Sequence, residues 1–269
     1  MRYKVQLLLI LSIFSFLSVF AQNPSGTEAK PKEKGSFYFT WGYNKDWFSK
    51  SDLHFESDGE DNYSFTLYDV TAKDLPKVDH AFDVNLSIPQ YVYRFGYYFG
   101  KNKNLGIELA FDHAKYIMVQ NQTAHVKGTI HGEYMDKDTV LGVSFVKFEH
   151  TNGANFLMLN LMKRHQFLAS KNNHHRLQGV MKPGLGIVIP QSDVSLFGHR
   201  QNNYYHVAGY IFGLDLELRY EFRKHIFVET GFKGTFANYT NVLTVGDARA
   251  NHHFWCMQYI GAVGYQIAL

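Results

Sequence analysis

The chain has 269 residues, of which 45% are hydrophobic, 16% aromatic and 19% charged. Its 27 basic side chains nearly balance its 24 acidic ones, which leaves no electrostatic case for binding nucleic acid. The single cysteine, Cys256, excludes a disulfide within the chain.

The first residues have the pattern of a signal peptide. Two basic residues precede an apolar stretch of 14 residues, and Val19 and Ala21 fit the small-residue cleavage rule. Such a stretch is shorter than the roughly 20 residues that a membrane-spanning helix needs. We therefore predict a signal peptide over residues 1–21, followed by a disordered polar segment over residues 22–35.

The rest of the chain alternates between apolar and polar residues. In 206–222, for example, Leu214 and Leu216 have one parity and Asp215 and Glu217 have the other. Alternation with many aromatic residues is typical of a transmembrane β-barrel, whose strands are apolar only on the lipid side. Eight segments are close to the 9–11 residues that a tilted span requires. They are 36–44, 90–100, 105–117, 154–168, 176–190, 206–222, 225–240 and 255–269.

The connections between these segments alternate in length. Three are short, namely 101–104, 171–175 and 223–224. Four are longer, namely 45–90, 118–153, 191–205 and 241–253. Short periplasmic turns that alternate with longer extracellular loops are typical of outer-membrane barrels, and an even strand count puts both ends of the barrel on the periplasmic side.

The strand count has an alternative. Residues 125–134 and 139–149 also alternate, around turn-like residues 135–138. They form either a hairpin that projects outside the membrane or two more spans, which would make ten strands. The apolar face of this region is thin, so we favour the projecting hairpin and a closed, antiparallel, up-and-down barrel of eight strands.

The last segment alternates most regularly. Tyr265, Ile267 and Leu269 fall on one parity, and Gln266 and Ala268 fall on the other. With this apolar closing strand and the signal peptide, residues 36–269 resemble the small outer-membrane barrels of Gram-negative bacteria, of the OmpA and OmpX type. The resemblance implies outer-membrane location, contact with outer-membrane lipid and lipopolysaccharide, and insertion by the barrel-assembly machinery. It implies no function, because one fold can host many.

Eleven charged residues have the parity of the lumen. An eight-stranded barrel is only just wide enough for side chains to fill it, and buried charges must pair. We therefore predict a network of ion pairs that closes the lumen; a gated ion path is the alternative. The residues are Arg94, Glu108, Asp112, Arg164, Lys182, Asp215, Glu217, Arg219, Glu221, Glu229 and Lys233.

The chain has 14 histidines, and eight lie at the predicted outer rim or in its loops. Imidazoles bind metals and haem, but the sequence contains neither an HExxH motif nor a clustered Cys/His signature. We therefore predict neither a metal nor a cofactor. The eight are His113, His125, His131, His150, His199, His206, His252 and His253.

One segment at the predicted outer rim, 148–153, is a candidate catalytic site. Outer-membrane phospholipases and lipid A deacylases use a histidine with a nearby serine, commonly as His-x-Ser-Asn, and His150, Thr151 and Asn152 are similar in part. However, Thr151 follows His150 directly, so in a strand the two side chains would face opposite ways. Asn152-Gly153 is also a strong turn signal.

Three functional hypotheses follow. The first is a barrel with a charge-filled lumen and a structural or loop-mediated binding role, which is not an enzyme and whose external ligand is unknown. The second is a lipid A or phospholipid hydrolase with its site near His150, Thr151 and Asn152. The third is a small-solute channel. The first loop, 46–89, is long and acidic around Asp58, and loops of such length are usually functional or disordered. Binding of an external partner through this loop is a hypothesis that no particular residue supports.

Overall fold

The computed structural model describes residues 34–59, 62–75, 90–100, 102–223 and 225–269. The predicted signal peptide, and the predicted disordered segment up to residue 33, lie outside the described residues. Within the described part of the chain, no helix is long and apolar enough to cross a membrane.

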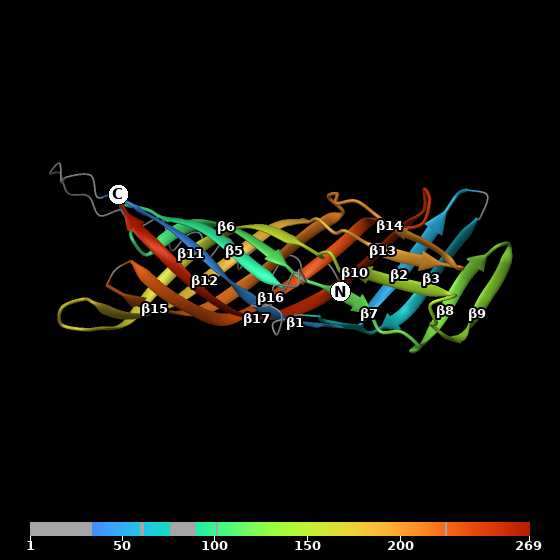
Figure 1. Cartoon of the computed structure of the whole chain (residues 1–269), viewed down its shortest axis with the longest axis horizontal. Helices are drawn as coiled ribbons and strands as arrows, with labels where there is room; N and C mark the ends of the chain where they lie inside the picture. Colours follow the sequence, from blue (N-terminus) through green and yellow to red (C-terminus); the bar gives the residue numbers. More distant parts are fainter. Residues whose placement is uncertain (1–33, 60–61, 76–89, 101, 224) are drawn as a thin grey trace, which may run out of the picture. The chain divides into compact units, whose positions relative to one another are not determined.

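Eight antiparallel strands form a closed ring (Figure 1). In ring order they are β1 (Ser36–Phe48), β5 (Tyr91–Tyr98), β6 (Leu105–His113), β11 (Phe156–Ala169), β12 (His175–Val188), β15 (Gly209–Phe222), β16 (Ile226–Leu243) and β17 (Arg249–Ala268). The pairing of β1 with β17 closes the ring, from Ser36 opposite Ala268 to Phe48 opposite Cys256. The predicted eight-stranded, up-and-down barrel is confirmed.

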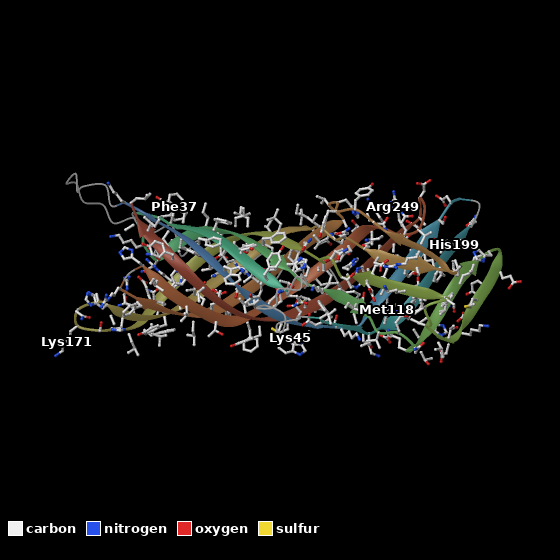
Figure 2. All side chains as sticks on the ribbon, in the orientation of Figure 1. Phe37, Lys45, Met118, Lys171, His199 and Arg249 are labelled. Atoms are coloured by element: carbon white, nitrogen blue, oxygen red, sulfur yellow. The ribbon has the colours of Figure 1, made fainter. Side chains whose placement is uncertain are left out.

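The ring strands turn their apolar side chains outward. On β15, Leu214, Leu216 and Leu218 are 40–52% exposed, whereas Asp215 and Glu217 between them are buried. Phe37, labelled in Figure 2, is one of many outward-facing aromatic residues on this wall. Because strand side chains alternate in direction, this polarity makes the wall apolar outside and charged inside.

The connections that we predicted as long loops are largely folded into two sheets beyond the ring (Figure 1). One sheet continues from β17 through β2 (Ser51–Ser57), β3 (Tyr63–Val70), β8 (Thr123–Ile130) and β9 (Glu133–Val140). The other contains β4 (Ala72–Lys73), β7 (Tyr116–Met118), β10 (Val146–His150), β13 (Asp193–Leu196) and β14 (His199–Asn202). We call these nine strands, with the ends of β16 and β17 that reach them, the head.

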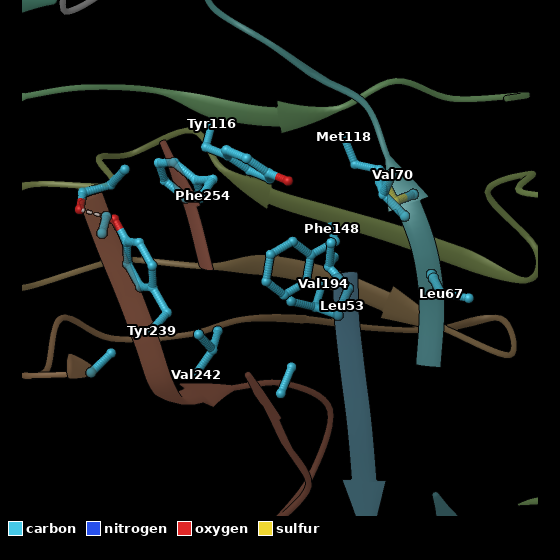
Figure 3. Close-up of a cluster of buried hydrophobic side chains, with 14 of the residues drawn as sticks. Leu53, Leu67, Val70, Tyr116, Met118, Phe148, Val194, Tyr239, Val242 and Phe254 are labelled. Carbon is cyan, nitrogen blue, oxygen red and sulfur yellow. Dashed lines mark hydrogen bonds between the residues drawn. The ribbon is translucent and has the colours of Figure 1, made fainter. Parts of the chain in front are cut away.

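The head has an apolar core of its own (Figure 3). Phe55 of one sheet packs edge-on against Phe148 of the other, with ring centroids 5.7 Å apart. Leu53, Phe65 and Val194 are fully or almost fully buried beside them. Each buried side chain of this size stabilises the fold by about 1.5–3 kcal/mol, which is why the connections are ordered.

The hairpin of β8 and β9 lies in the head and not in the ring, as we favoured. Our placement of its turn at residues 135–138 is wrong, because those residues lie within β9 and pair with β8, and the chain turns at His131 and Gly132. The backbone φ angles there are +51° and +81°. Two consecutive positive φ angles define the tight turn that matches the twist of a hairpin, and glycine takes the second position without strain.

Candidate functional site

The interior of the ring holds the first candidate site. All eleven charged side chains that we assigned to the lumen are buried, and none exposes more than 8% of its surface. Five of them are cationic and six are anionic. Burial of this many charges is tolerated where ions of opposite sign compensate one another, so their contacts decide what the lumen does.

Lys182 is the hub of these contacts. Its Nζ lies 3.0 Å from Glu108, 2.5 Å from Glu217 and 3.7 Å from Glu229. The three carboxylates come from β6, β15 and β16. One ammonium group therefore joins strands on several sides of the ring.

A second set of contacts crosses the lumen. Lys233 Nζ on β16 lies 2.5 Å from the Asp112 carboxylate on β6, and Arg94 pairs with the same carboxylate. In the ring order, β6 and β16 are separated by three strands in either direction. They are opposite walls, so the Lys233–Asp112 contact spans the lumen.

Arginines and aromatic rings complete the interior. Arg219 lies 2.6 Å from Glu229, and its guanidinium sits 4.0 Å from the centre of the Phe227 ring. Arg164 stacks on Tyr98 at the same distance. Such cation–π contacts stabilise buried guanidinium groups in addition to their ion pairs, because the face of an aromatic ring attracts a cation.

Two uncharged residues that we did not single out belong to this network. The Tyr38 hydroxyl and the Asn160 amide both donate hydrogen bonds to Glu108. A side chain at Gly96 would overlap the Tyr38 ring, so the glycine provides the space for this tyrosine. The lumen parity could have identified Tyr38 and Asn160, because both alternate with outward apolar neighbours.

The head contains the second candidate site, a chain of hydrogen-bonding side chains within the apolar core. Ser192 Oγ lies 2.9 Å from His150 Nδ1, and His150 Nε2 lies 3.3 Å from His252 Nε2. His252 Nδ1 lies 3.3 Å from Ser51 Oγ. We call these four residues the serine–histidine relay.

Aromatic rings enclose the relay. Tyr239 stacks on both imidazoles, with centroids 5.1 Å from His150 and 4.8 Å from His252. Its hydroxyl is held by the Ala154 carbonyl, drawn as the dashed line in Figure 3. Burial, and then the nearby His206 imidazole, lowers the pKa of His150 to about 3. Burial also holds the pKa of His252 well below its ordinary value, so both imidazoles are neutral at physiological pH.

The structure separates the three residues that we proposed as catalytic. His150 is fully buried, whereas Thr151 is half-buried and Asn152 is exposed in a turn. The hydroxyl beside His150 belongs to Ser192 instead. Ser192 lies 42 residues further along the chain, and no local motif marks it, so sequence reasoning missed it.

The other rim histidines have separate surroundings. His113 pairs with Asn155, His125 with Asp136 and Asp138, and His206 donates to a backbone carbonyl. Among the residues that the structure describes, no group of three or more His, Cys, Asp or Glu side chains is arranged to hold a metal ion.

No family model and no curated protein matches the chain. Among solved structures, it is similar to the attachment invasion locus protein Ail of Yersinia pestis in complex with the heparin analogue sucrose octasulfate, at 10% identity over 87% of this chain and 99% of that chain, with a TM-score of 0.33. It is also similar to the outer membrane protein OprG of Pseudomonas aeruginosa, at 11% identity over 88% and 98% of the two chains, with a TM-score of 0.35. Neisserial surface protein A is a third, at 9% identity over 83% and 96%, with a TM-score of 0.30. These neighbours are small Gram-negative outer-membrane barrels, the class that the sequence resembles.

Proposed function

We propose that this protein is an integral barrel of the Gram-negative outer membrane, whose ion-paired lumen closes the pore and whose rigid head binds a partner outside the cell. One observation carries the proposal: the ring is apolar outside and charged inside, whereas the head has an apolar core. Each arrangement is stable only in its own solvent, hydrocarbon for the ring and water for the head.

The outward face of the ring supports the membrane placement. A soluble barrel that exposed Leu214, Leu216, Leu218 and their neighbours on every strand would aggregate, whereas lipid covers them without cost. We expect these residues to contact outer-membrane lipid and lipopolysaccharide, and the barrel-assembly machinery to insert the chain.

The lumen contacts support closure over conduction. The Lys233–Asp112 contact joins opposite walls, and Lys182 holds carboxylates from three strands. An ion entering this space would have to separate buried pairs, at a cost of several kcal/mol for each. A small-solute channel is therefore the less favoured function.

The head supports a binding role because folded sheets hold surface side chains in fixed positions. Tyr68, Tyr134 and Val140 are exposed on β3 and β9, over a core that does not depend on the membrane. A preorganised surface loses little entropy when it binds, which favours affinity. The chemistry of the external partner stays open.

The test combines three measurements on the purified full-length protein in detergent. We expect a faster-migrating band in unboiled gel samples, a β-type circular dichroism spectrum, and no discrete conductance steps in planar bilayers. A helical spectrum, or solubility without detergent, would refute the barrel placement. Discrete conductance would refute closure and favour the channel.

A further inference from the structure

The serine–histidine relay is not needed by a barrel that only anchors a binding surface. Apolar side chains of the same volume would fill this part of the core without buried polar atoms to satisfy. Four polar residues from separate parts of the chain converge here instead. Their arrangement matches a nucleophile, its base and a third group that orients the base.

Two opposite proton assignments satisfy every contact in the relay, and the one that suits catalysis begins at Ser192. Ser192 donates its hydroxyl proton to His150 Nδ1, and His150 Nε2–H donates to His252 Nε2. His252 Nδ1–H then donates to Ser51 Oγ. In this state the lone pair of His150 Nδ1 faces the Ser192 hydroxyl, as general-base catalysis requires.

A strap over residues 203–208 lies beside the relay. Asn203 donates to the Ser192 carbonyl at 2.9 Å, and Ala208 pairs with Val188, so both ends are pinned by backbone hydrogen bonds. The middle is held by side chains, because the Tyr205 hydroxyl donates to the Asn152 carbonyl at 2.6 Å and His206 to the Asn241 carbonyl at 2.6 Å. Residues 203–208 adopt neither helix nor strand.

The strap also indicates the class of substrate. Tyr204, Tyr205 and Val207 are 51–69% exposed, and the chain continues directly into β15, where Tyr210 and Phe212 face outward with the lipid-facing wall. Large apolar side chains at this level lie where the barrel meets the membrane surface. A molecule that displaces the strap would come from the lipid.

We propose that Ser192 and His150 are the nucleophile and base of an ester hydrolase, positioned by His252, that cleaves an acyl ester of a membrane lipid when the 203–208 strap lifts. This inference rests on the membrane placement proposed above. It replaces Thr151 with Ser192 as the hydroxyl of the hydrolase hypothesis.

The reaction balances without a further reagent except water. Ser192 Oγ bonds to the ester carbonyl carbon, its proton passes to His150 Nδ1, and the bond to the alcohol oxygen breaks as that oxygen takes the proton. Water then attacks the acyl-serine, gives a proton to His150 Nδ1, and releases the fatty acid as the proton returns to Ser192. His252 accepts a hydrogen bond from His150 throughout and orients its ring.

Strap opening would also activate the base. Burial is the main cause of the low pKa of His150, so admitting water would return that pKa toward its ordinary value of about 6.5. A base with such a pKa is effective near neutral pH. The closed strap therefore corresponds to an inactive relay.

The experiment is labelling of the full-length protein in detergent micelles with a biotinylated alkyl fluorophosphonate, followed by peptide mapping by mass spectrometry. We expect an adduct on Ser192 and none on Ser195, which is buried in the adjoining strand and serves as the internal control. Mapping the wild-type protein identifies the serine, so the result does not depend on how a variant folds. A folded barrel without a Ser192 adduct would overturn the inference.

Four variants sharpen the test. Y205F removes the strap hydrogen bond and should speed labelling about fivefold, the factor that one ordinary hydrogen bond is worth. H150F should slow labelling roughly 100-fold or more. H252F should slow it as well, and H252N, which restores an acceptor, should recover part of the rate; equal rates for these two would show that His252 does not position His150.

Gel mobility measured on the same samples separates the two proposals. A heat-modifiable barrel that is not labelled refutes the hydrolase and leaves the membrane placement intact. A protein without heat-modifiable mobility refutes the membrane placement itself.

Discussion

Strand β17 passes through both regions of the molecule, and its inward face changes composition along the way. Near the C-terminus that face carries Gln258 and Gln266, whereas within the head it carries Ala250 and Phe254. The alternation in direction continues without interruption, because all four side chains are buried. What changes is the partner of these residues: Gln258 donates to the buried Asp46 carboxylate in the ring, whereas Phe254 packs in the apolar core of the head.

The inversion follows from the two solvents. In the membrane placement that we propose, lipid covers the outward apolar side chains of the ring, so the interior is free to hold charges and to join strands by ion pairs. In the head the surroundings are water, so apolar side chains gain by turning inward. The same backbone therefore supports two opposite cores, and each core should respond to opposite substitutions.

The largest expected effect comes from breaking the ionic core. Lys182→Met leaves Glu108, Glu217 and Glu229 without their shared cation, which should cost about 3–5 kcal/mol of unfolding free energy in detergent. Lys147→Met is the matched control in the head, where the partly exposed Lys147 pairs with Glu149 and Asp193. This substitution should lower the unfolding free energy by about 1 kcal/mol or less. Equal losses in urea titrations would contradict the distinction between the two cores.

The apolar core should be nearly as sensitive, but locally. Leu53→Ala removes a fully buried side chain from the head and should cost about 2–5 kcal/mol. We expect faster proteolysis of the head while the gel mobility shift of the barrel persists. Tyr134→Ala, at a position 66% exposed, should leave proteolysis unchanged. Loss of the mobility shift in Leu53→Ala would show that the two cores unfold as one unit.

The outer surfaces should differ as the cores do. Leu216→Arg places a charge on the wall that we assign to lipid, and should cost about 2–4 kcal/mol for unfolding in lipid vesicles. Val140→Arg makes a comparable change at a 58% exposed site in the head, and should change stability by about 0.5 kcal/mol or less. An unchanged unfolding free energy for Leu216→Arg would show that this surface faces water and not lipid.

The smallest effect is a pH dependence on the surface of the head. Hydrogen bonds with Asp138, and then with Asp136, raise the pKa of the exposed His125. Because the pKa of His125 is raised in the folded state, these contacts stabilise the β8–β9 hairpin fully at pH values below the unfolded-state pKa of about 6.5. This stabilisation is lost as the pH rises through the folded-state pKa. NMR titration should show a higher pKa for His125 in the wild-type protein than in the Asp138→Asn variant. Identical pKa values would exclude the His125–Asp138 contact in solution.

Local pattern was sufficient for the ring strands because each of them has one apolar outer face and one polar inner face, which gives a period of two within every strand. Parity alone assigned Arg94, Glu108 and Lys182 to the side on which the structure buries them. It could not pair them, since Lys233 meets Asp112 across the ring, 121 residues away. That contact depends on strand number and stagger, which are properties of the closed sheet.

The head was harder to predict for a related reason. Its strands are short, and the hairpin turn at His131 was misplaced because a histidine with positive φ carries a weak sequence signal. The contact between Ser192 and His150 joins the segment after β12 to the end of β10, and the intervening β11 and β12 belong to the ring. The pairing of β10 with β13 in one sheet, with Glu149 opposite Asp193, brings Ser192 and His150 together, and no local spacing rule predicts which strands pair.

The sequence by itself therefore determined the up-and-down β-barrel class with eight or ten strands, the apolar closing strand, and the parity of the charged residues, because each follows from side-chain alternation along the strands. The tertiary structure decided which charges pair, that the long connections build a second core, and that Ser192 and not Thr151 stands beside His150. Those outcomes depend on contacts between residues far apart in the chain, whose free energy is gained only when the ring closes and the sheets pack.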